Sequence, residues 1–443
     1  MKQPAHDLTV LISGVALLLL TAIVYYSALP GSFQFDDFNV IVNNAKVHSW
    51  SAWRAELPSM RPLLKLSYLG NWLLDARPWG FHLFNVCCHA VNVLLVLALG
   101  RQLFAAQPDG VLIAIIAAAI FALHPAQTEA VTYISGRSIT LMGTFYLGSL
   151  VAGCSGYRAL RLVVSPLLFA AALLTKEIAW TLPLALLLIN YLRVMPAREN
   201  VLRVVPHALV GLAVVVLFFF TPAYQRLFQH SISIRPLLDN LALQVDGWFY
   251  LITRPLLLLQ TNIDPELPAH PLFSTFWFAQ LLVLFIVLLL ALQWRQLVFG
   301  FGLLWFLLQL LPTNSLLPRN DIANDRQLYL ALLGPAWMLA SGLVTVVTQK
   351  LIIPFATLLM VSLGIATMTR NRDYLDEIQL WQSTADQSPT KARVWNNLGY
   401  AYQLAGFSAE ARVAYQHALH LDPDMDRARI NLLLLEPIAA PAK

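Results

Sequence analysis

The chain has 443 residues, of which 58% are hydrophobic and only 12% are charged. Soluble domains carry about 25% charged residues, so this composition excludes an ordinary soluble enzyme and indicates a protein embedded in lipid. The formal net charge of +5 is small and scattered, which disfavours a nucleic-acid-binding surface. The three cysteines lie in apolar stretches, and we expect no disulfide framework.

Apolar stretches long enough to approach the thickness of a bilayer recur along the first 370 residues. The first of them is too long for the apolar core of a cleaved signal peptide, and we expect it to be a retained span. The pattern predicts a polytopic all-α bundle of about 11 spans. They are expected at residues 8–29, 81–101, 110–124, 138–156, 160–175, 177–193, 204–221, 272–293, 296–312, 327–348 and 351–369.

Basic residues in short loops predict which way the spans run. With a cytoplasmic N-terminus, the cytoplasmic loops would hold arginines such as Arg101, Arg158 and Arg193, and the other side would hold a mixture of acids and bases. Residues 237–260 are apolar but carry three charges, which favours an interfacial or re-entrant helix over a span. The absence of any N-glycosylation sequon favours a bacterial protein of the inner (cell) membrane.

A polar tail, residues 371–443, is expected to form a unit separate from the transmembrane part, residues 1–370. Residues 392–425 fit one tetratricopeptide repeat, a pair of helices that buries its apolar faces by stacking on other pairs. The tail would dock on the membrane part or on a protein partner, and the alternative is a structural cap without a recognition role. The residues at the packing and turn positions of the repeat are Trp395, Leu398, Gly399, Tyr402, Gly406, Ala411, Tyr415, Ala418 and Pro423.

Two polar clusters follow the first span. Asp36 and Asp37 could supply a general base, because adjacent carboxylates repel and one of them can have a raised pKa. A helix cap or turn is the alternative interpretation. Arg61 opens a short amphipathic stretch, residues 61–75, for which the alternative is an interfacial helix with cations that reach toward water.

Three more clusters join later spans on the same predicted side. His124, Glu129 and Arg137 could orient one another and hold an anion, although ordinary loop chemistry is the alternative and the spacing fits no known metal site. Lys176 and Glu177 form the whole connection between two spans, where an ion pair that fixes the turn is the alternative.

The last cluster runs from Asn314 to Arg326. Arg326 starts a span and would lie at phosphate depth, where a guanidinium binds phosphate oxygens with two hydrogen bonds. The alternative is anchoring at the membrane interface by Arg326 and Tyr329. Under one topology all these clusters lie outside the cytoplasm, which favours a shared function.

The order of several motifs resembles a known family. FQFDDFNVIVNNAKV, RPLLKLSYLGNW, FHLFNVCCHAVNVLL, FALHPAQTEAVTYISGR, LLTKEIAWTLPLALLL and PTNSLLPRNDIANDRQLYL precede the tetratricopeptide tail. Together they resemble the transmembrane-and-tetratricopeptide-repeat O-mannosyltransferases and their bacterial relatives, which belong to the GT-C glycosyltransferases. The repeat array is shorter than in the animal members, which leaves the sugar and the acceptor open.

The resemblance implies roles for particular residues. Asp36 would be the catalytic base, with Asp37 in support. Cations at four positions would bind the donor phosphate, and four further residues would orient the donor or support the architecture. The phosphate-binding residues are Arg61, Arg137, Lys176 and Arg326, and the supporting residues are His124, Glu129, Glu177 and Asn314.

The expected function is therefore transfer of a sugar from a polyprenyl-phosphate donor to a protein hydroxyl at the extracytoplasmic face, without a cofactor or a metal. The expected partners are the lipid-linked sugar, membrane lipids and a protein acceptor or a protein bound at the tail, and no nucleic acid. One alternative is a transferase, ligase or polymerase with a glycan or lipid acceptor. Others are a transporter or flippase, which the position of the charges at one boundary disfavours, and a non-catalytic scaffold.

Overall fold

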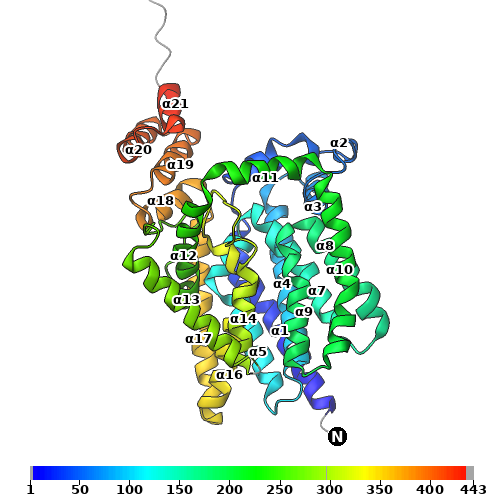
Figure 1. Ribbon diagram of the computed structural model, residues 1–443. Helices are drawn as coiled ribbons and strands as arrows, with labels where there is room; N and C mark the ends of the chain where they lie inside the picture. Colours follow the sequence, from blue (N-terminus) through cyan, green and yellow to red (C-terminus); the bar gives the residue numbers. More distant parts are fainter. Residues whose placement is uncertain (1–2, 296, 436–443) are drawn as a thin grey trace, which may run out of the picture.

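A computed structural model describes residues 3–295 and 297–435 of the chain (Figure 1). These residues form helices, and no β-strand occurs among them. The all-α fold predicted from the sequence is therefore confirmed. The longest helices form one bundle, and a smaller group of helices near the C-terminus lies at one end of it.

Each predicted apolar stretch contains one helix of this bundle. By length and composition, five of the described helices could cross a membrane, or up to seven if each of two bent helix pairs forms one span. The predicted 11 spans are not confirmed by this criterion, because other apolar helices of the bundle, such as α8, α9 and α14, are too short to meet it. The helices are α1 (Gln3–Tyr25), α4 (Pro78–Leu103), α5 (Gly110–Leu123), α7 (Arg137–Gly153), α8 (Ser165–Thr175), α9 (Leu182–Leu192), α10 (Ala197–Phe219), α13 (Thr275–Gln293), α14 (Val298–Leu310), α16 (Leu333–Val346) and α17 (Gln349–Asp373).

Three short helices lie across one end of the bundle. They are α2 (Trp50–Ala55), α3 (Pro62–Leu74) and α11 (Pro222–Ile234), and we call the end that they cover the upper end (Figure 1). The N-terminus lies at the opposite end, so α1 delivers the segment that follows it to the upper end. Helix α3 shows that most of the amphipathic stretch 61–75 is helical, as its alternative interpretation expects.

Helix α12 (Leu237–Thr253) begins and ends near the upper end of the bundle. Near its start, the Asn240 side chain donates hydrogen bonds to the carbonyls of Ser315 and Leu316, each at 3.2 Å. Just after its end, the carbonyl of Pro255 lies 3.1 Å from Nε2 of His124. Both contacts are to segments that connect bundle helices at the upper end, which is consistent with the interfacial interpretation of residues 237–260.

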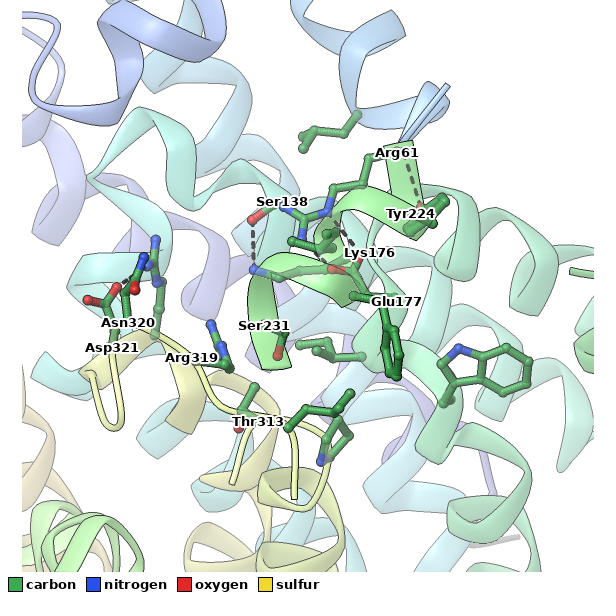
Figure 2. Close-up of a pocket in the computed structure, with 18 of the residues that line it drawn as sticks. Arg61, Ser138, Lys176, Glu177, Tyr224, Ser231, Thr313, Arg319, Asn320 and Asp321 are labelled. Atoms are coloured by element: carbon green, nitrogen blue, oxygen red, sulfur yellow. Dashed lines mark hydrogen bonds and ion pairs between the residues drawn. The ribbon is translucent and has the colours of Figure 1, made fainter. Parts of the chain in front are cut away.

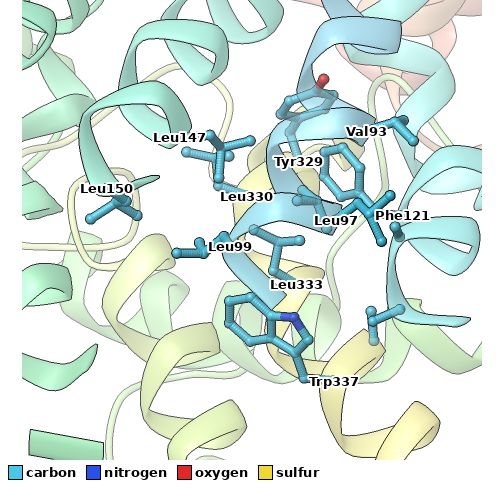
Figure 3. Close-up of a cluster of buried hydrophobic side chains, with 14 of the residues drawn as sticks. Val93, Leu97, Leu99, Phe121, Leu147, Leu150, Tyr329, Leu330, Leu333 and Trp337 are labelled. Atoms are coloured by element: carbon cyan, nitrogen blue, oxygen red, sulfur yellow. The ribbon is translucent and has the colours of Figure 1, made fainter. Parts of the chain in front are cut away.

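Small residues let the bundle helices approach closely. A Cβ atom on Gly334 of α16 would lie 2.1 Å from the carbonyl oxygen of Gly302 on α14, so neither position has room for a larger side chain. Close van der Waals packing of this kind holds helices together in lipid, because the hydrophobic driving force between helices is weak when lipid tails surround them. Larger side chains such as Phe121, Tyr329 and Trp337 fill the space between the helices (Figure 3).

The tail forms a stack of four helices beyond the upper end: α18 (Glu377–Gln387), α19 (Ala392–Leu404), α20 (Ser408–Leu421) and α21 (Asp426–Leu435). Gly406 has a φ of +84°, which glycine adopts without strain, and it lies in the turn between α19 and α20. A Cβ atom on Gly399 would lie 2.7 Å from the Tyr415 ring, so glycine lets these two helices pack face to face.

Candidate functional site

A cavity of about 890 Å³ lies at the upper end of the bundle, below α11 (Figure 2). It is lined by segments that are distant in the sequence: the turn after α1, α3, the connection between α8 and α9, α11 and the loop after α14. The polar lining side chains include three carboxylates and four cations: Asp36, Glu177, Asp321, Arg61, Lys176, Arg319 and Arg326. The cavity therefore brings together most of the charged clusters that were singled out in the sequence.

Asp36 is half-buried at the edge of this cavity. Its backbone N–H donates a hydrogen bond to the hydroxyl oxygen of Tyr133 at 2.9 Å, which helps to fix the turn that carries it. Burial raises the pKa of the Asp36 carboxyl above its ordinary value, and the positive charge of Arg326 opposes this rise. A carboxylate with a raised pKa and access to the cavity is suited to accept a proton.

Asp37 is buried beside the cavity and does not line it. Its carboxylate accepts hydrogen bonds from the backbone N–H of Gln34 at 3.0 Å and of Ser135 at 2.9 Å, and also from the Ser135 hydroxyl. Burial raises the pKa of Asp37 to about 7, although these hydrogen bonds favour the ionised form. The position of Asp37 supports the turn that presents Asp36.

Two predicted cations enter the cavity from α3 and from the connection between α8 and α9. Arg61 donates to Glu177, through Nε at 2.9 Å and through a second guanidinium nitrogen. Lys176 donates to the Ser138 hydroxyl at 3.0 Å, and no carboxylate among the described residues lies within ion-pair distance of it. The alternative interpretation of Lys176 and Glu177 as a mutual ion pair is therefore wrong, because Glu177 pairs with Arg61.

The loop after α14 supplies the remaining charges. Arg326 lies 3.4 Å from Glu129 and 3.4 Å from Asp321, so two carboxylates hold its guanidinium. Arg319 is different, because its guanidinium has no ion-pair or hydrogen-bond partner in the described part of the chain. Burial, together with the nearby charge of Arg326, lowers the pKa of Arg319 to about 10, so it remains a cation at neutral pH.

Lys176 and Arg319 are thus the cations of the cavity that no carboxylate neutralises. Figure 2 shows that both side chains point toward the middle of the cavity. Burial, with Arg61 and Arg326 nearby, lowers the pKa of Lys176, and a bound anion would oppose this shift. An anion such as a phosphate would find two charge-assisted hydrogen-bond donors there.

Besides Asp37, four predicted site residues do not line the cavity: Glu129, which pairs with Arg326, and the three residues that follow. Arg137, predicted to bind phosphate, is fully buried, where its guanidinium donates to the side chain of Asn85 and to the carbonyls of Ser67 and Phe81 at 2.9–3.1 Å. His124 accepts a hydrogen bond from the backbone of the turn that follows it. Asn314 donates to the side chain of Gln244 and the carbonyl of Ile322.

These three side chains have structural contacts for specific physical reasons. The aromatic rings of Tyr68, Phe81 and Phe84 surround the Arg137 guanidinium and stabilise it as a cation. His124, Glu129 and Arg137 do not orient one another as the sequence suggested, because Glu129 pairs with Arg326 instead. Among the described residues, no group of three or more histidine, cysteine, aspartate or glutamate side chains could hold a metal ion.

Sequence reasoning missed Arg319, Asp321 and the cavity-lining residues of α11, such as Tyr224 and Ser231. Arg319 and Asp321 lie within the polar cluster from Asn314 to Arg326, but nothing in the sequence distinguishes them from ordinary loop residues. The amphipathic pattern of residues 222–234, which begins with a proline, is the signal that could have revealed α11.

The fold and the cavity define a class of protein: a polytopic helical membrane protein with an acid and several cations gathered at one end of its bundle. Comparison with known proteins finds relatives along most of the chain. The chain is 26% identical to protein O-mannosyl-transferase F38B6.6 of Caenorhabditis elegans, over 96% of this chain and 64% of that protein. It is 24% identical to protein O-mannosyl-transferase TMTC3 of Mus musculus, over 93% of this chain and 51% of that protein.

These relatives support the resemblance to the TMTC family that the motif order suggested. The chain spans 64% or less of the length of these relatives. A shorter match, 30% identical over 47% of this chain, is to protein O-mannosyl-transferase Tmtc2 of Drosophila melanogaster. No protein-family model and no solved structure matches the chain.

Proposed function

We propose that this protein is an integral-membrane glycosyltransferase of the GT-C type that moves a sugar from a polyprenyl-phosphate donor to a hydroxyl of a protein acceptor. The names of its relatives support a sugar transferase that acts on proteins. The observation that carries the proposal is the cavity, in which Asp36 lies together with two unneutralised cations, Lys176 and Arg319.

The chemistry needs a base for the acceptor and positive charge for the leaving group. Asp36 takes the proton of the acceptor hydroxyl, and the acceptor oxygen attacks the anomeric carbon of the sugar. The bond from this carbon to the phosphate oxygen breaks, and the phosphate leaves with the electron pair. Lys176, Arg319 and Arg326 stabilise the negative charge that develops there. Attack from the opposite face inverts the anomeric configuration.

An apolar side of the cavity would admit the lipid chain of the donor. Leu184, Leu227, Phe228, Leu311 and Leu317 line the cavity, and each is exposed on the surface of the bundle. In a bilayer these side chains would face lipid tails, so a polyprenyl chain could enter sideways while its phosphate remains near the cations. This scheme uses a lipid-linked sugar and requires no cofactor or metal.

The remaining parts of the proposal concern topology and the tail. We propose eleven crossings within residues 1–370, a tetratricopeptide tail at residues 371–443, and a bacterial inner membrane with the cavity on the extracytoplasmic side. Helices α19 and α20 support the repeat, because Gly399 and Tyr415 pack where its two helices meet. A docked tail suits a protein acceptor or partner better than a glycan or lipid acceptor.

Replacement of the base tests the mechanism. In Asp36→Asn, transfer of a labelled sugar from polyprenyl phosphate in proteoliposomes should fall by about 10²- to 10⁴-fold, because the amide cannot accept the proton. The matched control is Asp75→Asn, which removes an exposed carboxylate that pairs with Arg77 outside the cavity. Normal turnover in correctly folded Asp36→Asn would show that another group is the base.

The acceptor needs a separate experiment. Mass spectrometry of surface proteins with and without the gene should reveal hexose on serine or threonine that depends on this protein. A change confined to glycolipids or polysaccharides would instead support the alternative acceptor. Flux of a lipid-linked sugar without any covalent product would favour a flippase.

A further inference from the structure

A chain of charged side chains leads from the tail to the cavity. Arg393, at the start of α19, donates to Asp264 Oδ2 at 2.8 Å and to Asp321 Oδ1 at 2.7 Å. Asp321 lines the cavity, and its other carboxylate oxygen lies 3.4 Å from a guanidinium nitrogen of Arg326. One arginine of the tail therefore contacts a carboxylate of the cavity wall directly.

The contact belongs to a built interface between the tail and the segment that follows α12. Asp264 is buried and also pairs with Lys391, which donates to the carbonyl of Pro265 at 2.9 Å. The Ser388 hydroxyl accepts hydrogen bonds from the Asn262 side chain at 2.9 Å and from the backbone N–H of Glu266 at 3.0 Å. These bonds hold the start of α19 at a fixed distance from the cavity.

The same interface is tied to the loop that carries the phosphate-binding cations. The backbone N–H of Asn262 donates to the Asp325 carboxylate at 2.7 Å, next to Arg326 in the sequence. Movement of the tail would therefore be transmitted to residues 319–326 through two contacts, one to Asp321 and one to Asp325.

The negative charge of Asp321 opposes anion binding in the cavity unless a nearby cation neutralises it. A free carboxylate in the cavity wall would repel a phosphate and would attract Arg326 and the unpaired Arg319 toward itself. Arg393 supplies the neutralising charge from outside the cavity, where it does not compete for the phosphate. The planar guanidinium of Arg393 donates hydrogen bonds to Asp264 and Asp321 at once. A lysine ammonium lacks this forked arrangement of donors.

We propose that Arg393 is a positioning residue for the donor phosphate, and that the docked tail is thereby a working part of the cavity. The inference rests on the proposed function in one respect, namely that the bound anion is the phosphate of a polyprenyl carrier. Arg393 touches neither the lipid nor the sugar. It acts by holding Asp321, so that Arg319 and Arg326 are available to the phosphate.

Binding of undecaprenyl phosphate to the full-length protein in nanodiscs tests the proposal. We expect Arg393→Gln to bind about tenfold more weakly than the wild type, a usual size for coupling between sites. The matched control is Lys391→Gln, which removes a cation from the same interface but has no contact with Asp321, and it should bind like the wild type. Asp321→Asn introduced into Arg393→Gln should restore binding, because it removes the unneutralised carboxylate.

Amide hydrogen exchange gives a readout that does not depend on the ligand. Arg393→Gln should speed exchange within residues 319–326, and Lys391→Gln should speed it only at the tail interface. Equal weakening of binding by both variants would overturn the proposal, because it would show a purely structural role for docking. Unchanged exchange in residues 319–326 of Arg393→Gln would also overturn it. A wild type that does not bind undecaprenyl phosphate would contradict the proposed function, while the exchange data would still decide the role of Arg393.

Discussion

Asp36 and Asp37 are neighbours in the sequence, but they occupy different environments. Asp36 faces the cavity, whereas the carboxylate of Asp37 is enclosed by hydrogen-bond donors from Gln34 and Ser135. The different roles proposed for Asp36 and Asp37 follow from this geometry, because only the side chain that reaches the cavity can exchange a proton with a substrate. The buried one fixes the turn.

The pKa of Asp37 leads to a prediction for stability. The folded-state pKa of about 7 lies above the ordinary value of 3.8, so the folded protein holds this proton more tightly than the unfolded chain does. The resulting stabilisation is complete below about pH 4 and is lost as the pH rises to about 7, by about 1.4 kcal/mol for each pH unit.

Thermal unfolding in detergent checks this prediction. Asp37→Asn cannot titrate at this position, so the stability of the wild type relative to this variant should decrease as the pH rises through the window. Groups elsewhere titrate equally in both proteins and cancel in the comparison. A difference that stays constant across the window would contradict the raised pKa.

The sequence identified many of the charged cavity residues because charges are conspicuous between apolar stretches. Asp36, Arg61, Lys176, Glu177 and Arg326 were all found in this way and line the cavity. An arginine that a bundle encloses among aromatic rings looks the same in a sequence as one that faces a ligand. For this reason Arg137 was assigned to phosphate binding, and the cavity-lining Arg319 was overlooked.

Helix α11 covers the cavity and joins two of its walls. The Tyr224 hydroxyl accepts a hydrogen bond from the backbone N–H of Arg61 at 3.3 Å, and the Ser231 hydroxyl donates to the carbonyl of Pro318 at 2.6 Å. Its side chains Leu227 and Phe228 line the cavity and are also exposed, so α11 lies where the cavity meets the proposed lipid surface.

Phe228→Glu tests the entry of the lipid chain beside α11. A charge at this position would be costly against a polyprenyl chain, so the KM for a long-chain donor should rise about tenfold or more. The KM for a short-chain, water-soluble donor analogue should change little. Gln229→Glu adds the same charge to an exposed neighbour that does not line the cavity, and it serves as the control. An equal rise for both donors would exclude this route.

The apolar pattern predicted the bundle helices well and predicted the connections poorly. Long apolar runs such as residues 81–101 become helices in lipid because every backbone group must be bonded internally. Short amphipathic segments such as α11 and α12 depend on the bundle for their position, since their hydrogen bonds reach loops more than sixty residues away in the sequence. That information is absent from any local pattern.

The path of the whole chain places the N-terminus at one end and both the cavity and the tail at the other (Figure 1). The positive-inside rule then predicts that the end with Arg158 and Arg193 is cytoplasmic and that the tail lies outside. The ion pair between Arg393 and Asp321 requires that the tail and the cavity lie on the same side of the membrane.

Thiol labelling of intact spheroplasts checks the sidedness. In a protein whose native cysteines are replaced, Ala405→Cys in the tail should react with a membrane-impermeant maleimide. Gly156→Cys, at the connection between α7 and α8, should react only after the membrane is opened. Ala405 is exposed, and a Cβ atom at Gly156 would have open space around it. Both substitutions should therefore preserve folding. The reverse labelling pattern would place the cavity in the cytoplasm.

The contact between Gly302 and Gly334 has a consequence far from where it occurs. Helices α14 and α16, which bear these glycines, lead into and away from the loop that carries Arg319 and Arg326, so their separation sets how widely the base of that loop is spread. A methyl group at either glycine would push the two helices apart and shift the guanidinium groups that face the cavity. Substitutions of Gly302 or Gly334 would therefore lower activity as the loss of a substrate contact would, although neither glycine lines the cavity.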